Sequence, residues 1–361
     1  MKHNTPRLRA GMLKTPLVFL IAILAAFLVS IIFIAALGVN PFFAFGKLLS
    51  GAFGKTSSIF EILAKSTPLI IMGLGISIGI RGGLSNLGGD GQFYVGAVCS
   101  VIVGIYLPQT LPAPLIWLLG AAAAIVSGML YGALAGFLKA KFNTNEVIIT
   151  IMLNYVAQYV TSWLVSGPLQ APGGIPQTRA LQPSYCLPKL MQGTRAHWGF
   201  VIAILLAFGV WFLFKKTALG YRIEAVGEAP EAAVYGGIRK NRYTILILGI
   251  SGAFCGLAGM AEVYGTYYRV LDGITTSFGF TAMLIALLAR LNPFAVIAGS
   301  LFISILTVGA NSMQISLNVP TSIVNVIQSL IIVFVLIMPS MTAHVQARHT
   351  RKLEQKEVQR S

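Results

Sequence analysis

The chain has 361 residues, of which 56% are hydrophobic and only 10% are charged, and its formal net charge is +16. Soluble domains carry about 25% charged residues, so this composition excludes an ordinary water-soluble protein and indicates an integral membrane protein. The positive charge does not require nucleic acid as a partner, because Lys and Arg collect in the cytoplasmic loops of membrane proteins. Three scattered cysteines provide neither a disulfide framework nor a metal-binding spacing.

Apolar segments long enough to cross a bilayer recur along the chain. A spanning helix needs about 20 mostly apolar residues, because its backbone must satisfy its own hydrogen bonds in hydrocarbon. The first run is longer than the core of a signal peptide, so we expect an uncleaved first span. The predicted spans are residues 17–38, 59–80, 93–107, 113–138, 147–166, 198–214, 243–264, 278–290, 293–311 and 321–338. The predicted fold class is an all-α polytopic membrane protein with about ten transmembrane helices.

The distribution of positive charge predicts the orientation. With both termini in the cytoplasm, nineteen Lys and Arg lie on the cytoplasmic side and seven on the opposite side, as the positive-inside rule requires. We therefore expect a cytoplasmic N-terminal tail, a transmembrane domain with one long external loop and one long cytoplasmic loop, and a cytoplasmic C-terminal tail. The N-terminal tail is residues 1–16 and the C-terminal tail is residues 340–361. The transmembrane domain is residues 17–339, with the external loop at 167–197 and the cytoplasmic coupling loop at 215–242.

Ten spans divide into two halves of five, and an odd number of spans in each half would make the halves inverted copies. Spans 93–107 and 278–290 are the shortest and occupy matching positions in the two halves. Glycine-rich sequence precedes the first of them, and Pro293 follows the second. Short, interrupted segments at corresponding positions indicate a transport site. The alternative is that both are tilted helices or are imprecisely bounded.

Polar residues occur at two places beside or within these spans. Residues 82–96, GGLSNLGGDGQFYVG, place six glycines around Asn86, Asp90 and Gln92. In span 147–166, Thr150, Asn154 and Gln158 share one helix face. Polar groups at this depth often line a pathway, whereas helix capping and hydrogen bonds between helices are the alternatives. The predicted pathway residues are Asn86, Asp90, Gln92, Glu146, Asn154, Tyr155 and Gln158.

The cytoplasmic loop contains an unusual acidic segment. Residues 217–238, TALGYRIEAVGEAPEAAVYGGI, hold three of the ten acidic residues of the chain. Pro230 suits the first turn of a helix, Glu228 and Glu231 suit its positive end, and a Gly-Gly pair suits its termination. A helix this short needs a surface on which to dock. Acidic side chains are disfavoured beside an anionic leaflet and favour a protein partner; a helix resting on lipid headgroups is the alternative.

Other function classes lack the residues that they would need. The sequence GKTSS at 54–58 is not a phosphate-binding loop, because that loop requires glycine where Leu49 stands. The sequence shows no metal-binding cluster and no catalytic dyad, so we expect neither enzymatic activity nor a metal. An ion-coupled secondary transporter is one rival, and it would depend on Asp90, Glu146 or Glu262 as a membrane carboxylate. A membrane-embedded enzyme is the other.

The chain resembles the permease subunit of ABC importers in the nucleoside and simple-sugar family, which also has branched-chain amino acid and ribose-like members. Four stretches carry the resemblance, and together they cover most of residues 60–310: LSNLGGDGQFYVGA, NEVIITIMLNYVAQYVTSWLVSGP, TALGYRIEAVGEAPEAAVYGGI and GFTAMLIALLARLNPFAVIAGSLF. The second stretch and the long outer loop are more similar to the nucleoside branch than to the ribose or galactose branches. One departure is Asp90, where the family pattern has Glu.

The resemblance implies that the short cytoplasmic helix docks into a cleft of a separate ATPase and transmits its closure to the spans. The predicted coupling residues are Glu224, Glu228, Glu231, Ala232, Ala233 and Gly236. It further implies that this chain holds no cofactor, because ATP is bound by the partner ATPase. The expected partners are that ABC ATPase subunit, a second homologous permease in a heterodimer, an external substrate-binding lipoprotein and the lipid bilayer. The expected location is the bacterial cytoplasmic (inner) membrane, and the expected cargo is a nucleoside, with a simple sugar such as ribose or galactose as the alternative.

Overall fold

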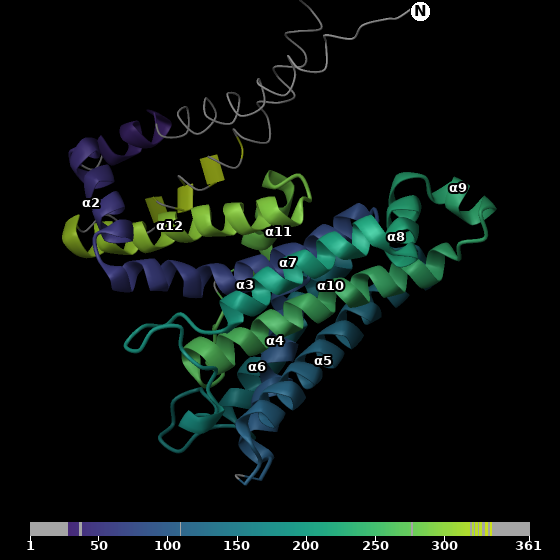
Figure 1. Cartoon of the computed structure of the whole chain (residues 1–361), viewed down its shortest axis with the longest axis horizontal. Helices are drawn as coiled ribbons and strands as arrows, with labels where there is room; N and C mark the ends of the chain where they lie inside the picture. The colour runs from purple at the N-terminus through teal and green to yellow at the C-terminus, as the bar shows by residue number, and fades with distance from the viewer. Residues whose placement is uncertain are drawn as a thin grey trace, which may run out of the picture. The chain divides into compact units, whose positions relative to one another are not determined.

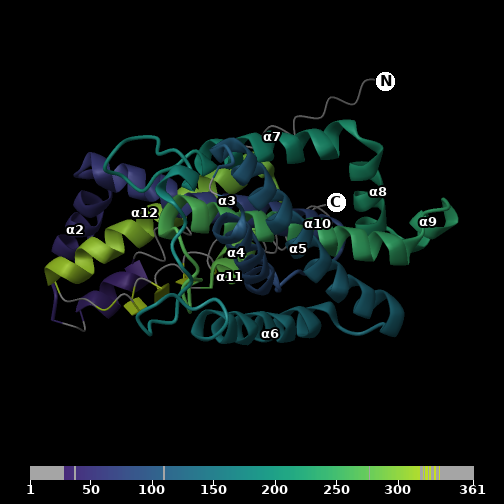
Figure 2. The same ribbon diagram turned by 90° about the horizontal axis from the view of Figure 1, so that it is seen from below.

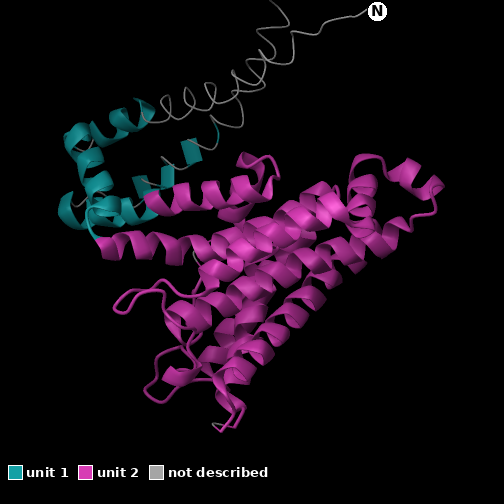
Figure 3. Ribbon diagram, in the orientation of Figure 1, with its two compact units in different colours: residues 1–55, 306–361 teal, residues 56–305 magenta. Residues whose placement is uncertain are grey.

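The computed structural model describes residues 28–35, 38–108, 110–275 and 277–317, with isolated positions between 320 and 333. Within these residues the regular elements are helices, and pairing of extended backbone is limited to isolated bridges. The chain divides into two units, residues 1–55 with 306–361 and residues 56–305 (Figure 3). All the predicted pathway and coupling residues belong to the second unit.

The second unit is a bundle of helices (Figure 1). Its elements are α3 (Thr56–Arg81), α4 (Gly89–Tyr106), α5 (Ala113–Phe142), α6 (Glu146–Ser166), α7 (Gly199–Lys216), α8 (Ala218–Glu228), α9 (Pro230–Tyr235), α10 (Lys240–Glu262), a π-helical turn (Val263–Tyr267), α11 (Phe278–Leu288) and the first part of α12 (Pro293–Leu317). Each predicted span between residues 59 and 311 coincides with one of these helices, although several ends differ by a few residues.

Length and composition distinguish the helices that can cross a bilayer. In the described part of the chain, six helices are long and apolar enough to do so: α3, α5, α6, α7, α10 with its π-helical turn, and α12. Helix α11 has only 11 residues, about 16 Å at 1.5 Å per residue, which is too short to cross the hydrocarbon. The predicted spans 17–38 and 321–338 lie mostly outside the described residues. The total of ten spans and the sidedness of the termini therefore stay predictions.

The first unit contains a helix that the sequence analysis did not predict. Helix α2 (Pro41–Phe53) occupies the stretch between the first two predicted spans. It begins at a proline, and the Asn40 side chain caps it by accepting hydrogen bonds from two backbone N–H groups. Its small residues pack closely within the unit, since a Cβ placed on Gly51 would lie 2.2 Å from the Cβ of Ser312. Capping and packing therefore stabilise a helix in a segment that is too short to be identified as a membrane span.

Helices α5 and α10 cross with their backbones in contact, and they run side by side in Figures 1 and 2. A Cβ added to Gly132 would lie 2.2 Å from the carbonyl oxygen of Leu248, and one added to Gly128 would lie 2.4 Å from that of Gly252. Small residues let membrane helices approach this closely, and van der Waals packing then holds them together. The α5 face consists of residues four apart: Gly120, Ala124, Gly128, Gly132 and Gly136.

The predicted external loop, residues 167–197, forms no spanning helix and is ordered by short bridges and a 3₁₀ turn at Pro183–Tyr185. His197 anchors its end in the bundle. The imidazole Nδ1 accepts a hydrogen bond from the backbone N–H of Gly199 at 3.1 Å. The ring lies against Gly265 of the π-helical turn, where an added Cβ would clash with it. Burial lowers the pKa of His197 to about 4, so the ring is neutral at physiological pH.

We expect the His197 environment to make stability depend on pH. The pKa falls from 6.5 in the unfolded chain to about 4 in the folded chain, so the unfolded state binds more protons between these values. The stabilisation is complete above pH 6.5 and is lost as pH falls towards 4, by about 3 kcal/mol in all. Thermal unfolding in detergent at pH 7.5 and pH 5 measures about 2 kcal/mol of this loss, because pH 5 lies above the folded-state pKa of about 4. His197→Asn keeps an acceptor for Gly199 without the titration, so an equal loss in this variant would refute the assignment.

Candidate functional site

A pocket of about 240 Å³ opens among α4, α6 and the segment that precedes α11. Its α6 residues lie near the middle of that helix, so the pocket is far from either end of α6. The helix lies at the edge of the unit, against α4 and α5 (Figure 2). The lining residues are Asp90, Tyr94, Ile151, Asn154, Tyr155, Gln158, Thr275 and Ser277.

The beginnings of the two short predicted spans meet at this pocket. The Asp90 carboxylate, in the first turn of α4, accepts hydrogen bonds from the Thr275 hydroxyl at 3.0 Å and from the backbone N–H of Gly279 at 2.9 Å. Gly279 is in the first turn of α11, where backbone N–H groups lack partners in the helix and the helix dipole favours an anion. Asp90 therefore joins α4 to α11.

Asn154 joins α6 to the same place. Its side-chain oxygen accepts a hydrogen bond from the backbone N–H of Gly91, and its amide nitrogen donates to the carbonyl oxygen of Leu87, each at 2.7 Å. A Cβ added to Gly91 would lie 3.0 Å from the Cα of Asn154. This amide therefore satisfies backbone groups at the start of α4, and it forms a wall of the pocket that has little freedom to turn towards a ligand.

Asn86 and Gln92, predicted as pathway residues, do not line the pocket. Both side chains are buried, and they bond to each other at 2.8 and 3.2 Å. The Asn86 amide also donates to the Ser251 hydroxyl of α10, at 2.8 Å, and its oxygen accepts from the backbone N–H of Gly88. These bonds follow the alternative interpretation of the segment, in which its polar groups hold helices together, and they fix the connection that positions Asp90.

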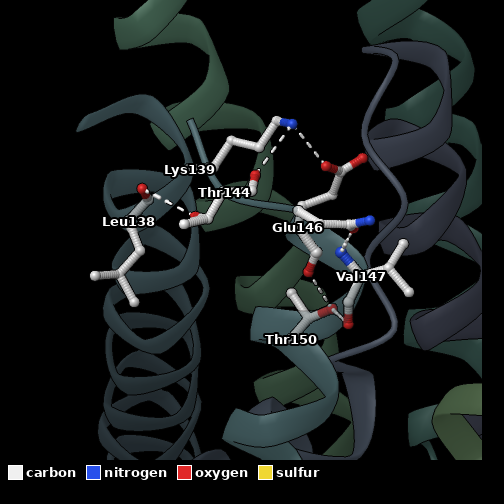
Figure 4. Close-up of polar contacts among 7 residues, drawn as sticks. Leu138, Lys139, Thr144, Glu146, Val147 and Thr150 are labelled. Atoms are coloured by element: carbon white, nitrogen blue, oxygen red, sulfur yellow. Dashed lines mark hydrogen bonds and ion pairs between the residues drawn. The ribbon is translucent and has the colours of Figure 1, made fainter. Parts of the chain in front are cut away.

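Glu146, also predicted as a pathway residue, lies outside the pocket at the first residue of α6. Its carboxylate forms an ion pair with Lys139 at 2.7 Å (Figure 4). The Thr150 hydroxyl donates to the backbone carbonyl of Glu146 at 2.7 Å. Thr150 thus turns to its own helix backbone, although the sequence places it on the face of Asn154 and Gln158. The ion pair ties the ends of two helices.

The side chains that remain available at the pocket are those of Tyr155, Gln158 and Ser277. All three are exposed in this chain, and among the described residues no hydrogen bond involving their polar side-chain atoms is formed. The sequence analysis missed Tyr94, four residues after Asp90 on α4, and also missed Thr275 and Ser277. A signal for Tyr94 was present, because residues four apart share a helix face. Placement of the other two depends on the loop before α11.

The acidic segment forms two helices at one end of the bundle (Figure 1). The predicted helix PEAAVY is confirmed as α9: it begins at Pro230, carries Glu231 in its first turn and ends at Gly236, whose N–H bonds to the Ala232 carbonyl. Ala233 is buried, whereas the neighbouring Tyr235 is 93% exposed. The exposed side of α9 is therefore available to a partner.

The predicted coupling residues do not form a single surface. Glu231, Ala232 and Gly236 are exposed on α9, and Glu228 is exposed at the end of α8. Glu224 instead points into the bundle, where its carboxylate pairs with Arg81 at 2.6 Å. A partner that binds α9 would thus contact part of the predicted set directly and Glu224 only through α8.

Comparison with known proteins adds independent information. Residues 58–336 match the family model described as the permease component of branched-chain amino acid transport systems. The chain is 34% identical over 328 residues to the guanosine ABC transporter permease protein NupP of Bacillus subtilis, covering 88% of this chain and 92% of the relative.

Two further relatives are similar at the same level. The nucleoside ABC transporter permease protein NupB of Lactococcus lactis is 32% identical over 334 residues, which cover 88% of this chain and 90% of the relative. The glucose ABC transporter permease protein TsgB13 of Haloferax volcanii is 32% identical over 329 residues, which cover 88% and 86%. No solved structure matches the chain.

Proposed function

We propose, on the premise that this chain belongs to the family of permease components of branched-chain amino acid transport systems, that it forms the translocation pathway of an ATP-driven importer of nucleosides. The family consists of membrane permeases of ABC transporters, and the apolar helices make this chain a multi-pass membrane protein. The observation that carries the proposal is the pocket at the middle of α6, where polar and aromatic side chains meet away from both ends of the helix.

The chemistry of the pocket suits a nucleoside. Such a solute has a flat aromatic base and a sugar with several hydroxyl groups. The ring of Tyr155 can contact the base, while Gln158 and Ser277 can replace hydrogen bonds that the solute makes with water. Each exchange of this kind has a small net free energy, so we expect weak binding, and an external binding protein would provide most of the selectivity.

A second permease would complete the pocket. Its volume of about 240 Å³ is below the roughly 300–1,000 Å³ typical of small-molecule sites. Two of its free polar groups, on Tyr155 and Gln158, also lie on the exposed side of α6, where hydrocarbon could not satisfy them. We propose that a related permease covers this side in a heterodimer, so that each chain contributes part of the route.

The remaining partners follow from the family and from α9. We propose that the exposed side of α9 docks on an ABC ATPase in the cytoplasm, and that a substrate-binding lipoprotein docks on the opposite side, at the loop 167–197. This arrangement requires the predicted orientation and places the chain in the bacterial cytoplasmic membrane. ATP would be bound by the ATPase, and this chain would hold no cofactor.

A simple sugar is the second candidate cargo, and it is favoured by the glucose permease among the relatives. Transport by the complete complex in vesicles distinguishes the two. ATP-dependent uptake of radiolabelled guanosine that excess unlabelled adenosine or uridine inhibits, and ribose or glucose does not, would support a nucleoside. Inhibition of uptake by the sugars alone would identify a simple sugar as the cargo in place of a nucleoside. Uptake by this chain alone with an ion gradient would instead favour the secondary transporter.

Reversal of charge on α9 tests the coupling proposal. We expect Glu231→Lys to reduce ATP hydrolysis stimulated by the loaded binding protein to the basal rate, because the exposed carboxylate faces the ATPase. Membrane insertion should be unchanged, since Glu231 makes no ion pair within the described residues. Lys55→Glu, on the predicted outer side and outside the loop at 167–197, is the matched charge reversal, because Lys55 is exposed. Full stimulation of the Glu231 variant would remove α9 from the coupling surface.

A further inference from the structure

Arg81, the last residue of α3, contacts three other parts of the bundle at once. Its guanidinium donates one hydrogen bond to the Glu224 carboxylate of α8 at 2.6 Å and another to the backbone carbonyl of Leu291, between α11 and α12, at 2.9 Å. The same group lies 4.3 Å from the centre of the Phe214 ring on α7. A single planar cation therefore joins α8 to the turn between α11 and α12.

Helix α8 is attached to the ends of α3 and α7 through backbone contacts. A Cβ added to Gly227 would lie 2.0 Å from the carbonyl oxygen of Arg81, and one added to Gly220 would lie 2.2 Å from that of Leu213. Only glycine permits such approaches without displacement of one backbone. We therefore expect α8 and α9 to move together with the ends of α3 and α7 and not as a loose loop.

The turn on the other side of Arg81 is held in an uncommon conformation. Arg290 and Leu291 both have positive φ, 49° and 60°, which side chains with a Cβ adopt only when the surrounding structure determines it. Helix α11 extends from this turn to the pocket over only 11 residues, about 16 Å. Its first turn receives the Asp90 carboxylate through Gly279. A displacement of the turn would thus reach the pocket along one short rigid helix.

The space around Arg81 is not closely packed. A cavity of about 280 Å³ separates the ends of α3, α7 and α8 from the beginning of α12. The rings of Phe208 and Phe294 meet across this region, with centroids 5.0 Å apart. Aromatic contact resists separation weakly compared with two charge-assisted hydrogen bonds from one guanidinium. Although α3 also packs on α11 farther along the bundle, Arg81 forms the charge-assisted connection across this cavity.

We propose that Arg81 is the positioning residue that transmits displacement of α8 and α9 to α11 and so changes the pocket at Ser277. This inference rests on the proposed function. The rival role is purely structural, in which Arg81 serves only to hold α8 through its ion pair with Glu224. The two roles differ in the bond to Leu291, which transmission requires and the ion pair does not.

Two substitutions separate the roles. Arg81→Lys keeps a positive charge for Glu224, but an ammonium lacks the planar fork that reaches two acceptors in fixed directions. The exchange Arg81→Glu with Glu224→Arg restores opposite charges between α3 and α8 and leaves no donor at position 81. Lys139→Ala is the control, because it removes another ion pair, at 2.7 Å from Glu146, between the ends of two helices.

The experiment measures the pocket directly in the assembled complex. Ser277→Cys is introduced together with Cys99→Ser and Cys186→Ser, and its labelling by a membrane-impermeant maleimide is timed without nucleotide and with bound ATP. We expect ATP to change the labelling rate about fivefold or more, a coupling of about 1 kcal/mol. This change should persist in the Lys139 control and disappear in both Arg81 variants, while the amount of assembled complex stays unchanged.

The outcomes bear on different conclusions. An ATP-dependent change that persists in Arg81→Lys or in the exchanged pair would overturn the transmission role, and absence of any change in the parent complex would overturn it as well. Neither result depends on which solute is carried, because no solute is added. Failure of nucleoside uptake in the transport assay would instead refute the proposed cargo and leave the labelling result to decide the role of Arg81.

Discussion

Replacing Gly128 by valine is expected to abolish accumulation of the folded protein. A Cβ at this position would lie 2.4 Å from the carbonyl oxygen of Gly252, and backbone on both sides leaves no flexible side chain to yield. Helices α5 and α10 would have to separate along the glycine face, which removes packing from the most extensive helix contact of the bundle. We expect a loss of more than about 4 kcal/mol, in the range of severe overpacking and backbone displacement.

The measurement is size-exclusion chromatography of the detergent-solubilised protein, followed by thermal unfolding of any monodisperse fraction. Gly209→Val is the matched control, because Gly209 lies within α7 and a Cβ there would meet nothing within 4 Å. Both variants add the same side chain to an apolar helix. We expect the control to accumulate and unfold like the parent protein. Equal behaviour of the two variants would show that the close approach of α5 and α10 is not required.

Removing the ring of Tyr155 is expected to reduce nucleoside uptake about tenfold or more. Stacking of a base on an aromatic side chain contributes about 1–3 kcal/mol, and a factor of ten corresponds to 1.4 kcal/mol. Tyr155 lines the pocket and is 52% exposed in this chain, so Tyr155→Ala removes a contact surface without opening a cavity in the core. The measurement is the initial rate of ATP-dependent uptake into vesicles that contain the complete complex.

Two controls make this result specific. Tyr155→Phe keeps the ring and removes only the hydroxyl, so we expect a reduction of about fivefold at most, the size of one hydrogen bond. Tyr159 lies one turn along α6, is 70% exposed and does not line the pocket. Tyr159→Ala should therefore leave the initial rate close to that of the parent. A similar loss in both alanine variants would show that the exposed side of α6 matters as an interface and that the pocket does not bind the base.

Local sequence predicted the helices between residues 59 and 311 and the short helix α9 well. Apolar length located each span between residues 59 and 311, because a helix in hydrocarbon must be apolar over a fixed distance. The caps of α9 were predictable for a related reason, since proline at its beginning and glycine at its end act through their own backbone geometry. Helix α2 was missed because it is short. Its formation depends on the cap at Asn40 and on packing within its unit.

The site was predicted only in part. Asp90, Asn154, Tyr155 and Gln158 come together at the pocket, whereas Glu146 pairs with Lys139 outside it. A sequence shows that a side chain is polar and near a span, but it does not show whether that side chain already has a partner. Likewise, the four-residue spacing of glycine on α5 was visible in the sequence, but the helix that it faces was not.

The sequence alone determined that this protein is a polytopic membrane protein, because hydropathy and charge asymmetry are properties of consecutive residues. Its resemblance to importer permeases implied a separate ATPase as the expected motor. Only the tertiary structure decided which polar groups face a pocket and which are consumed in holding helices together. That choice depends on contacts between residues far apart in the chain, such as Asp90 with Gly279 and Arg81 with Leu291. A buried polar group must find a partner wherever the fold supplies one, and no local pattern specifies where that partner lies.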